Sequence, residues 1–232
     1  MKKLGLLIFA AAIVIGVLVS SYFSIGQASG PFFSFSFGKK VKGSGNVTSE
    51  KREISGFSGV DVGGIFQVDV TANGEFGVEV TADDNLLPHI RTEVRNNILF
   101  IETDKRLITG GVLKVIVSAP DIENIETSGA SRVNVTGVEN RGIRIESSGA
   151  SKVGLSGETG ELFVDINGAS SVDSSGLRAS TAEVDASGAS KATVAATQEL
   201  KLRASGASKI LYSGNAEKIE KRSSGASSID EL

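Results

Sequence analysis

The sequence lacks several residue types on which whole classes of protein depend. Its 232 residues include no cysteine, one histidine, three prolines and no tryptophan. The missing cysteines exclude a disulfide framework, a thiolate metal site and a cysteine nucleophile, and one histidine excludes a histidine-rich metal centre. Lys and Arg total 24 against 27 Asp and Glu, so the basic excess of nucleic-acid-binding domains is missing and nucleic acid is not an expected partner. Frequent glycine, 28 residues, with so little proline favours many short strands.

An apolar run close to the N-terminus indicates export. Lys2 and Lys3 precede residues 4–25, which carry no charge and as a helix would extend roughly 33 Å, about one hydrocarbon core. The most apolar part, residues 4–19, also has the length of a signal-peptide core, and small residues allow cleavage near Ala28. We therefore predict that residues 1–28 are a transmembrane anchor or a signal peptide. Both alternatives place the remaining chain in the bacterial cell envelope, anchored if uncleaved and periplasmic or secreted if cleaved.

Residues 29–52 are predicted to be a linker, followed by one folded domain at residues 53–232. The linker combines phenylalanines that alternate with serine and a group of lysines: Phe32, Phe33, Phe35, Phe37, Lys39, Lys40 and Lys42. Such a stripe is typical of a segment at a membrane surface. It is equally typical of a first strand that packs on the domain, and the sequence leaves both alternatives open.

The second half of the chain is an internal repeat. A tetrapeptide of the form Ser/Asn-Gly-Ala-Ser occurs six times, with its glycine at Gly129, Gly149, Gly168, Gly188, Gly206 and Gly225. Consecutive glycines are separated by 20, 19, 20, 18 and 19 residues. A fixed period with variable content is the signature of stacked structural units that bury a common core.

Each repeat alternates apolar and polar residues on both sides of its glycine. Ile143 and Ile145 stand six and four residues before Gly149, and Val153 and Leu155 stand four and six residues after it. This period of two predicts two half-buried strands joined by a corner, at which glycine supplies a positive φ. The predicted fold class is all-β, a parallel β-solenoid with about six regular coils of 18–20 residues and irregular, larger coils N-terminal to them. An antiparallel sandwich is the alternative.

Several short motifs together resemble a known bacterial family. In order they are residues 64–68 (GIFQV), 84–90 (DNLLPHI), 97–101 (NILFI) and 119–121 (APD), followed by the six tetrapeptides. The set is similar to the head GIN domain family, described as putative auto-transporter adhesins, over about residues 54–232. The resemblance implies an exported β-solenoid without an established enzymatic activity, and it transfers no site residues.

Three columns of polar residues are the candidate functional groups. Stacked coils repeat every 4.8 Å or so, so equivalent residues form ladders. The acidic column, three residues before each glycine, is Glu126, Glu146, Asp165 and Asp185, and it changes sign at Arg203 and Arg222. The basic column, three residues after the glycine, includes Arg132, Lys152, Lys191 and Lys209. A serine and asparagine row comprises Ser128, Ser148, Asn167, Ser187, Ser205 and Ser224.

The leading functional hypothesis is a non-enzymatic, adhesin-like or scaffold module that binds an envelope component, a polysaccharide or another cell-surface molecule. The alternative is a carbohydrate-active enzyme, or a calcium- or polysaccharide-binding protein, that uses the acidic column. Self-association through the ends of the stack is a further prediction, because open sheet edges pair readily. No nucleotide-binding motif occurs, His89 stands alone without a catalytic triad, and no cofactor or metal is expected.

Overall fold

The computed structural model describes residues 40–232, and the predicted anchor or signal peptide lies outside the described residues. The described chain is all-β, which confirms the predicted class; its one helical element is the 3-10 turn η1 (Leu87–His89). The strands are β1 (Val41–Lys42), β2 (Val47–Arg52), β3 (Gly59–Gly64), β4 (Phe66–Ala72), β5 (Gly77–Asp83), β6 (Ile90–Arg95), β7 (Ile98–Thr103), β8 (Leu107–Ile108), β9 (Leu113–Ala119), β10 (Asn124–Gly129), β11 (Arg132–Ser147), β12 (Lys152–Ile166), β13 (Ser171–Ala186), β14 (Lys191–Ala204), β15 (Lys209–Ser213), β16 (Lys218–Ser223) and β17 (Ser228–Glu231).

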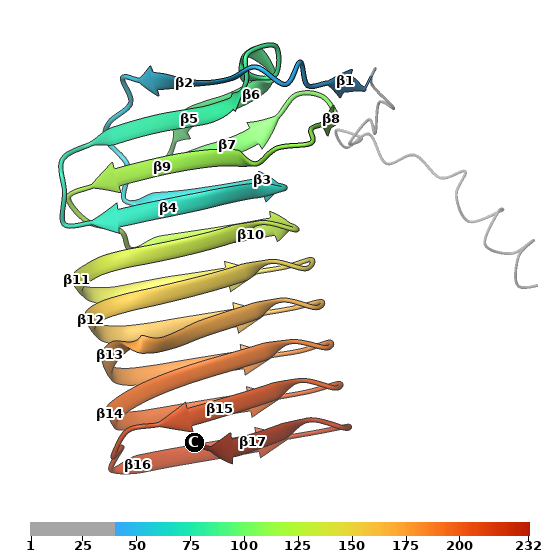
Figure 1. Ribbon diagram of the computed structural model, residues 1–232. Helices are drawn as coiled ribbons and strands as arrows, with labels where there is room; N and C mark the ends of the chain where they lie inside the picture. The colour runs from blue at the N-terminus through green and yellow to red at the C-terminus, as the bar shows by residue number, and fades with distance from the viewer. Residues whose placement is uncertain (1–39) are drawn as a thin grey trace, which may run out of the picture. The chain divides into compact units, whose positions relative to one another are not determined.

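From β10 onwards, each strand pairs in parallel with the strand one repeat further along the chain. Ile145 is in register with Val164, and Val164 is in register with Val184. The same parallel pairing continues through β14 to β15, β16 and β17. Figure 1 shows the result as successive turns of chain lying one beneath another. These ladders exclude the antiparallel sandwich for this half of the chain.

The buried face of the strands has the predicted phase. Sixteen residues predicted to point inward, six or four positions from a corner glycine, are all buried: Ile143, Ile145, Leu162, Val164, Ala182, Val184, Leu200, Leu202, Val133, Val135, Val153, Leu155, Ala192, Val194, Ile210 and Tyr212. At the last corner, Gly225, this burial ends, and Ile219 is 40% exposed. Parallel pairing in register places them in continuous apolar columns between the strands. One repeat could not bury its apolar side chains alone, so the neighbouring repeats provide the core.

The N-terminal part departs from a purely parallel stack. β3 and β4 continue the parallel ladders, pairing with β10 and β11. β5, however, runs antiparallel to β9 and to β2, and β6 runs antiparallel to β7. The sheet is therefore mixed, and the expectation that residues 54–120 simply add larger coils of the same kind is only partly right. Asn96 and Asn97, both with positive φ, form the hairpin turn between β6 and β7.

Part of the predicted linker belongs to the sheet. Within residues 29–52, the structure describes residues 40–52, which contribute β1 and β2. β2 forms six register pairs with β5, from Val47 with Asp83 to Arg52 with Val78. Arg52 also donates hydrogen bonds to the carbonyl oxygen of Ile90 (2.8 Å) and to Thr92 Oγ1 (2.8 Å). The folded region therefore begins before residue 53.

Candidate functional site

The corner glycines set the geometry on which the polar columns depend. All six have a positive φ, between 73° and 87°. At each corner the following alanine donates its amide hydrogen to the glycine carbonyl of the previous turn, as Ala169 does to Gly149 at 2.8 Å. The corners are consequently held in register by a hydrogen-bond ladder of their own, which fixes the side chains on either side of them.

The second serine of the tetrapeptide has a structural role that the sequence pattern alone did not assign. These serines are buried at 0–3 % exposure: Ser131, Ser151, Ser170, Ser190 and Ser208. Ser208 Oγ donates to the carbonyl oxygens of Ser205 (2.9 Å) and Ala186 (3.1 Å), and Ser131 Oγ donates to that of Gly64 (3.0 Å), so these two hydroxyls satisfy backbone acceptors inside the corner. The hydroxyls of Ser170 and Ser190 are buried without a hydrogen-bond partner among the described residues, so at these two corners the serine only fills space. Its presence in all six copies was the signal available in the sequence.

The acidic column forms a ladder on the face that precedes the corners, here called the first face. Glu126 is in register with Glu146, Glu146 with Asp165, and Asp165 with Asp185. Each carboxylate has a partner of its own. Asn124 donates to Glu126 (2.7 Å), Arg144 lies 3.7 Å from Glu146, and Asn167 donates to Asp165 (3.1 Å). Arg203 lies 3.2 Å from Asp185, so the negative charge of Asp185 is compensated by a basic residue of the same face.

Asp61 extends the acidic column by one position that the repeat pattern did not identify. It is in register with Glu126 and stands three residues before Gly64, whose own register partner is Gly129. Gly64 occupies a corner without the full tetrapeptide, which is why the repeat did not reveal the residue. Burial raises the pKa of Asp61 above its usual range, and the neighbouring Glu126 and Glu102 add to this, while Arg95 opposes it.

We expect Asp61→Asn to stabilise the protein at neutral pH. The pKa of Asp61 is higher in the folded protein than in the unfolded chain, so the folded protein binds this proton more tightly. As pH rises above the unfolded-state pKa, the unfolded chain loses the proton more readily, and Asp61 therefore lowers the stability of the fold at neutral pH. Melting temperatures measured between pH 3 and pH 8 should show a gain for the variant at pH 7 that disappears below about pH 3.8. Asp165→Asn, in an exposed position of the same column, is the matched control. A loss of stability at pH 7 would contradict the assignment.

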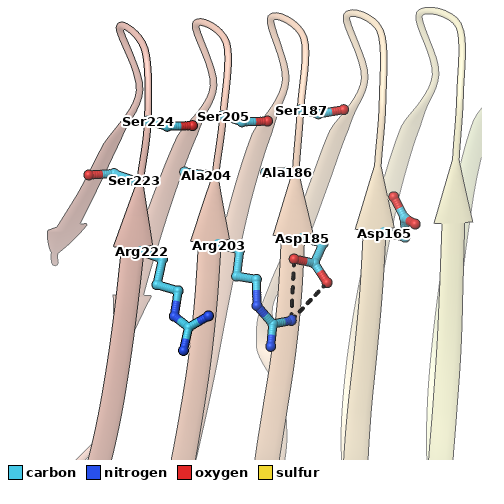
Figure 2. Close-up of a pocket in the computed structure, with 10 residues that line it drawn as sticks. All are labelled: Asp165, Asp185, Ala186, Ser187, Arg203, Ala204, Ser205, Arg222, Ser223 and Ser224. Atoms are coloured by element: carbon cyan, nitrogen blue, oxygen red, sulfur yellow. Dashed lines mark hydrogen bonds and ion pairs between the residues drawn. The ribbon is translucent and has the colours of Figure 1, made fainter.

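The column changes sign in a shallow groove on the first face. Figure 2 shows Asp165, Asp185, Arg203 and Arg222 on successive strands, beside the serine row. The groove has a volume of about 280 Å³ and is open to solvent. Arg203 bonds Glu183 at 2.5 Å and Asp185 at 3.2 Å, and these contacts raise the pKa of Arg203, with the Glu183 hydrogen bond as the largest cause. Within residues 40–232, Asp165 and Arg222 form no ion pair, although Asp165 accepts the Asn167 hydrogen bond, so each end of the groove carries one charge without an ion-pair partner.

The basic column lies on the face that follows the corners, here called the second face. Arg132 is in register with Lys152, and the column continues through Ser171 to Lys191 and Lys209. Lys209 lies 3.5 Å from Asp230. Among the residues that the structure describes, Arg132, Lys152 and Lys191 have no acidic partner within ion-pair distance. The two charged columns therefore do not neutralise each other across the corner.

The carboxylates and the single histidine of the described chain form no metal centre. No group of three or more His, Asp or Glu side chains between residues 40 and 232 is arranged to hold a metal ion. Over the same residues, no helix is long and apolar enough to cross a membrane. His89 Nδ1 lies 3.1 Å from Asp104 Oδ1, within hydrogen-bond distance, and Asp104 also lies 3.6 Å from Arg91.

Several solved structures described as putative adhesins have a similar fold. A "putative adhesin" from Bacteroides fragilis has a TM-score of 0.68 at 20% identity, over 83% of this chain and 100% of that one. Chains with the same description from Parabacteroides merdae (TM-score 0.54, 16% identity) and Parabacteroides distasonis (TM-score 0.52, 20% identity) each match over 84% of this chain and 100% of their own. At such identities the likeness concerns the fold alone. No curated protein matches the sequence.

A family model gives the more specific comparison. The model described as "Putative auto-transporter adhesin, head GIN domain" matches residues 56–216. The match begins just before β3 and continues through β15, so it includes five of the six tetrapeptide corners. The resemblance inferred from the sequence motifs is thereby confirmed. Since the match covers well over half of the chain, the protein belongs to the head GIN domain family.

Proposed function

We propose that the protein is an exported, non-enzymatic binding module, built as a parallel β-solenoid and held at the cell envelope by its N-terminus. In this proposal residues 1–28 are the anchor or the signal peptide, and the strands from β1 onwards form the exported head. The observation that carries the proposal is the outward arrangement of the polar columns. On the first face, Asp185, Arg203 and Arg222 recur in fixed register on one ladder, which suits the recognition of an extended, repetitive ligand.

The form of the surface favours binding over catalysis. Glycosidic hydrolysis needs two carboxylates at a defined separation across a cleft, one of them with a raised pKa. On the first face Glu126, Glu146 and Asp185 are each compensated by a neighbouring side chain. Asp61, the member of the column with a raised pKa, lies at its N-terminal end, away from the groove at Asp165. Shallow grooves with mixed charge suit a polymer that lies along the surface.

The expected partner is a polysaccharide or another cell-surface component. The groove at Asp165 and Arg222 offers one charge of each sign without an ion-pair partner, beside the hydroxyl groups of Ser187 and Ser205, and these groups can bond sugar hydroxyl and carboxylate groups. The family name and the predicted export signal support an envelope location.

Self-association of the head through its sheet edges at β16 and β17 is a second proposal, and sedimentation over a range of protein concentrations tests it.

A screen of the purified protein on an array of bacterial and host glycans, with and without calcium, tests the proposed function. We expect retention of polymeric glycans without any release of shorter products. Arg222→Ala should weaken retention, whereas Arg178→Ala, an exposed arginine outside the groove, serves as the matched control. Absence of binding to every envelope glycan, or cleavage of a bound one, would contradict the proposal.

The calcium-binding alternative makes a different prediction for the acidic column. If Glu146, Asp165 and Asp185 held a calcium ion, a chelator would lower the melting temperature, because a bound ion stabilises only the folded state. We expect no effect of the chelator, and we expect Asp165→Asn to change stability by less than about 1 kcal/mol, as for exposed charges. Thermal unfolding with and without chelator distinguishes the two. A drop of several degrees on chelation would favour the metal site.

A further inference from the structure

Three large apolar side chains are exposed together at the corner edge of the N-terminal part. Ile65, Ile108 and Val112 are 55%, 45% and 59% exposed. Phe66 and Leu113 are register partners, so the residues that precede them, Ile65 and Val112, lie side by side. Both also line one surface groove together with Thr109, the residue after Ile108. Ile65, Ile108 and Val112 are here called the apolar patch: Ile65 and Val112 are neighbours, and Ile108 directly precedes the groove residue Thr109.

Basic residues flank the apolar patch on two sides. Lys42 is in register with Ile108, and its strand β1 is fixed there by a hydrogen bond from the Gly43 amide to the Ile108 carbonyl oxygen (2.8 Å). Arg132 and Lys152 line the groove beside Ile65 and Val112. None of these three cations has an ion-pair partner among residues 40–232. Apolar side chains flanked by unpaired cations have the chemistry of a surface that meets an anionic lipid headgroup layer.

The chain reaches the fold next to this patch. Residue 40 leads directly into β1, where Val41 donates its amide hydrogen to Arg106 (3.1 Å) and pairs with Leu107. The uncharged run of residues 4–25 is joined to this point by residues 26–39. Extended backbone spans at most 3.3–3.6 Å per residue, so the connection is limited to roughly 50 Å. A head tethered through β1 therefore has its apolar patch beside the point at which the tether enters the fold.

We propose that the apolar patch, with Lys42, Arg132 and Lys152, is a membrane-docking surface that rests on anionic phospholipid. This inference rests on the proposed anchor, and it gives the head a defined orientation. Ile65, Ile108 and Val112 enter the headgroup region while the cations contact lipid phosphates, so the far turns and the first-face groove at Asp165 and Arg222 stay free for an envelope ligand. Each basic residue near an anionic leaflet contributes roughly 1 kcal/mol, so the flanking cations and the tether act together.

A single engineered cysteine tests this orientation, because the natural chain has none. Full-length Val112→Cys, labelled with a polarity-sensitive fluorophore, is reconstituted into vesicles of equal parts phosphatidylcholine and phosphatidylglycerol that contain a nitroxide-labelled lipid. Glu139→Cys, an exposed position beyond the Gly137 turn, is the matched control. Circular dichroism checks the fold of each variant. Alkaline extraction of the vesicles tests the anchor separately, so failure of the anchor and failure of the docking surface are distinguished.

We expect lipid quenching at position 112 to be several-fold stronger than at position 139, and to fall to the control level when Arg132→Glu and Lys152→Glu are added. Equal quenching at the two positions would overturn the proposal. Quenching that survives the charge reversals would overturn the assignment of an anionic surface. A fluorophore at position 112 that is already in apolar surroundings before lipid is added would show that another part of the chain or a second copy covers the patch, which also overturns the proposal.

Discussion

Gly168→Val is expected to destabilise the fold severely. Gly168 has a φ of +73°, and a Cβ added there would lie 2.6 Å from the carbonyl oxygen of Gly149 in the neighbouring turn. A left-handed conformation costs a residue with a Cβ about 1–2 kcal/mol. The clash adds to this, because the obstructing atom belongs to backbone and also accepts the Ala169 hydrogen bond at 2.8 Å. Thermal and urea unfolding should show a loss above about 2 kcal/mol.

Two other glycines separate the causes of this effect. Gly56 also has a positive φ, +80°, but an added Cβ would meet no atom within 4 Å. Gly77 has open space and no positive φ. The expected order of destabilisation by valine is therefore Gly168, then Gly56, then Gly77. Equal effects at Gly168 and Gly56 would mean that close approach between neighbouring turns contributes nothing, and an unchanged melting temperature for Gly168→Val would contradict the corner itself.

Val164→Asp is expected to have an even larger effect. Val164 is 4% exposed and lies between its register partners Ile145 and Val184, so the carboxylate would enter an apolar column with no group to bond it. Burial of an unpaired charge belongs to the short list of changes that cost more than about 4 kcal/mol. We expect loss of the cooperative unfolding transition, measured by circular dichroism during heating.

The neighbouring residue provides the control for this substitution. Asp165 points outward and is exposed, and its contact is a 3.1 Å hydrogen bond from Asn167. Asp165→Val should therefore leave most of the stability intact. Similar losses for Val164→Asp and Asp165→Val would reverse the assignment of the inward and outward positions along β12.

The regular half of the fold was predictable because two periodicities agree. The alternation of apolar and polar residues assigns Ile145 and Val164 to the interior, and the recurrence of the corner tetrapeptide aligns the repeats with one another. A one-residue slip would place every inward side chain outside, so the register is strongly determined by the sequence. For the same reason, the offsets of Glu146 and Lys152 from Gly149 are sufficient to place their two columns on opposite sides of a corner.

The irregular half and the apolar patch depend on contacts that carry no repeat signal. The reversal of β5 against β9 brings Val80 opposite Val115, a pairing that alternation permits in either direction. Likewise, Ile65 and Val112 become neighbours only through the pairing of β4 with β9. Asp61 lies between these two cases. It stands three residues before Gly64, as the acidic residues of the repeats do before their glycines, but Gly64 is not part of a Ser/Asn-Gly-Ala-Ser tetrapeptide. The direction of a strand and the burial of a carboxylate depend on contacts with residues far away in the sequence, and short sequence patterns do not specify those contacts.

The stacking of successive turns in register is the central claim, and a pair of nitroxide labels tests it most directly. Lys152 and Lys191 are both partners of Ser171, so two rungs of parallel sheet, about 10 Å in total, separate their backbones. The labelled Lys152→Cys, Lys191→Cys double variant should show strong dipolar broadening in its electron paramagnetic resonance spectrum. Lys152→Cys with Glu183→Cys places the second label on the opposite face and should show much weaker broadening. An unbroadened spectrum for the first pair, or equal broadening in both, would contradict the account.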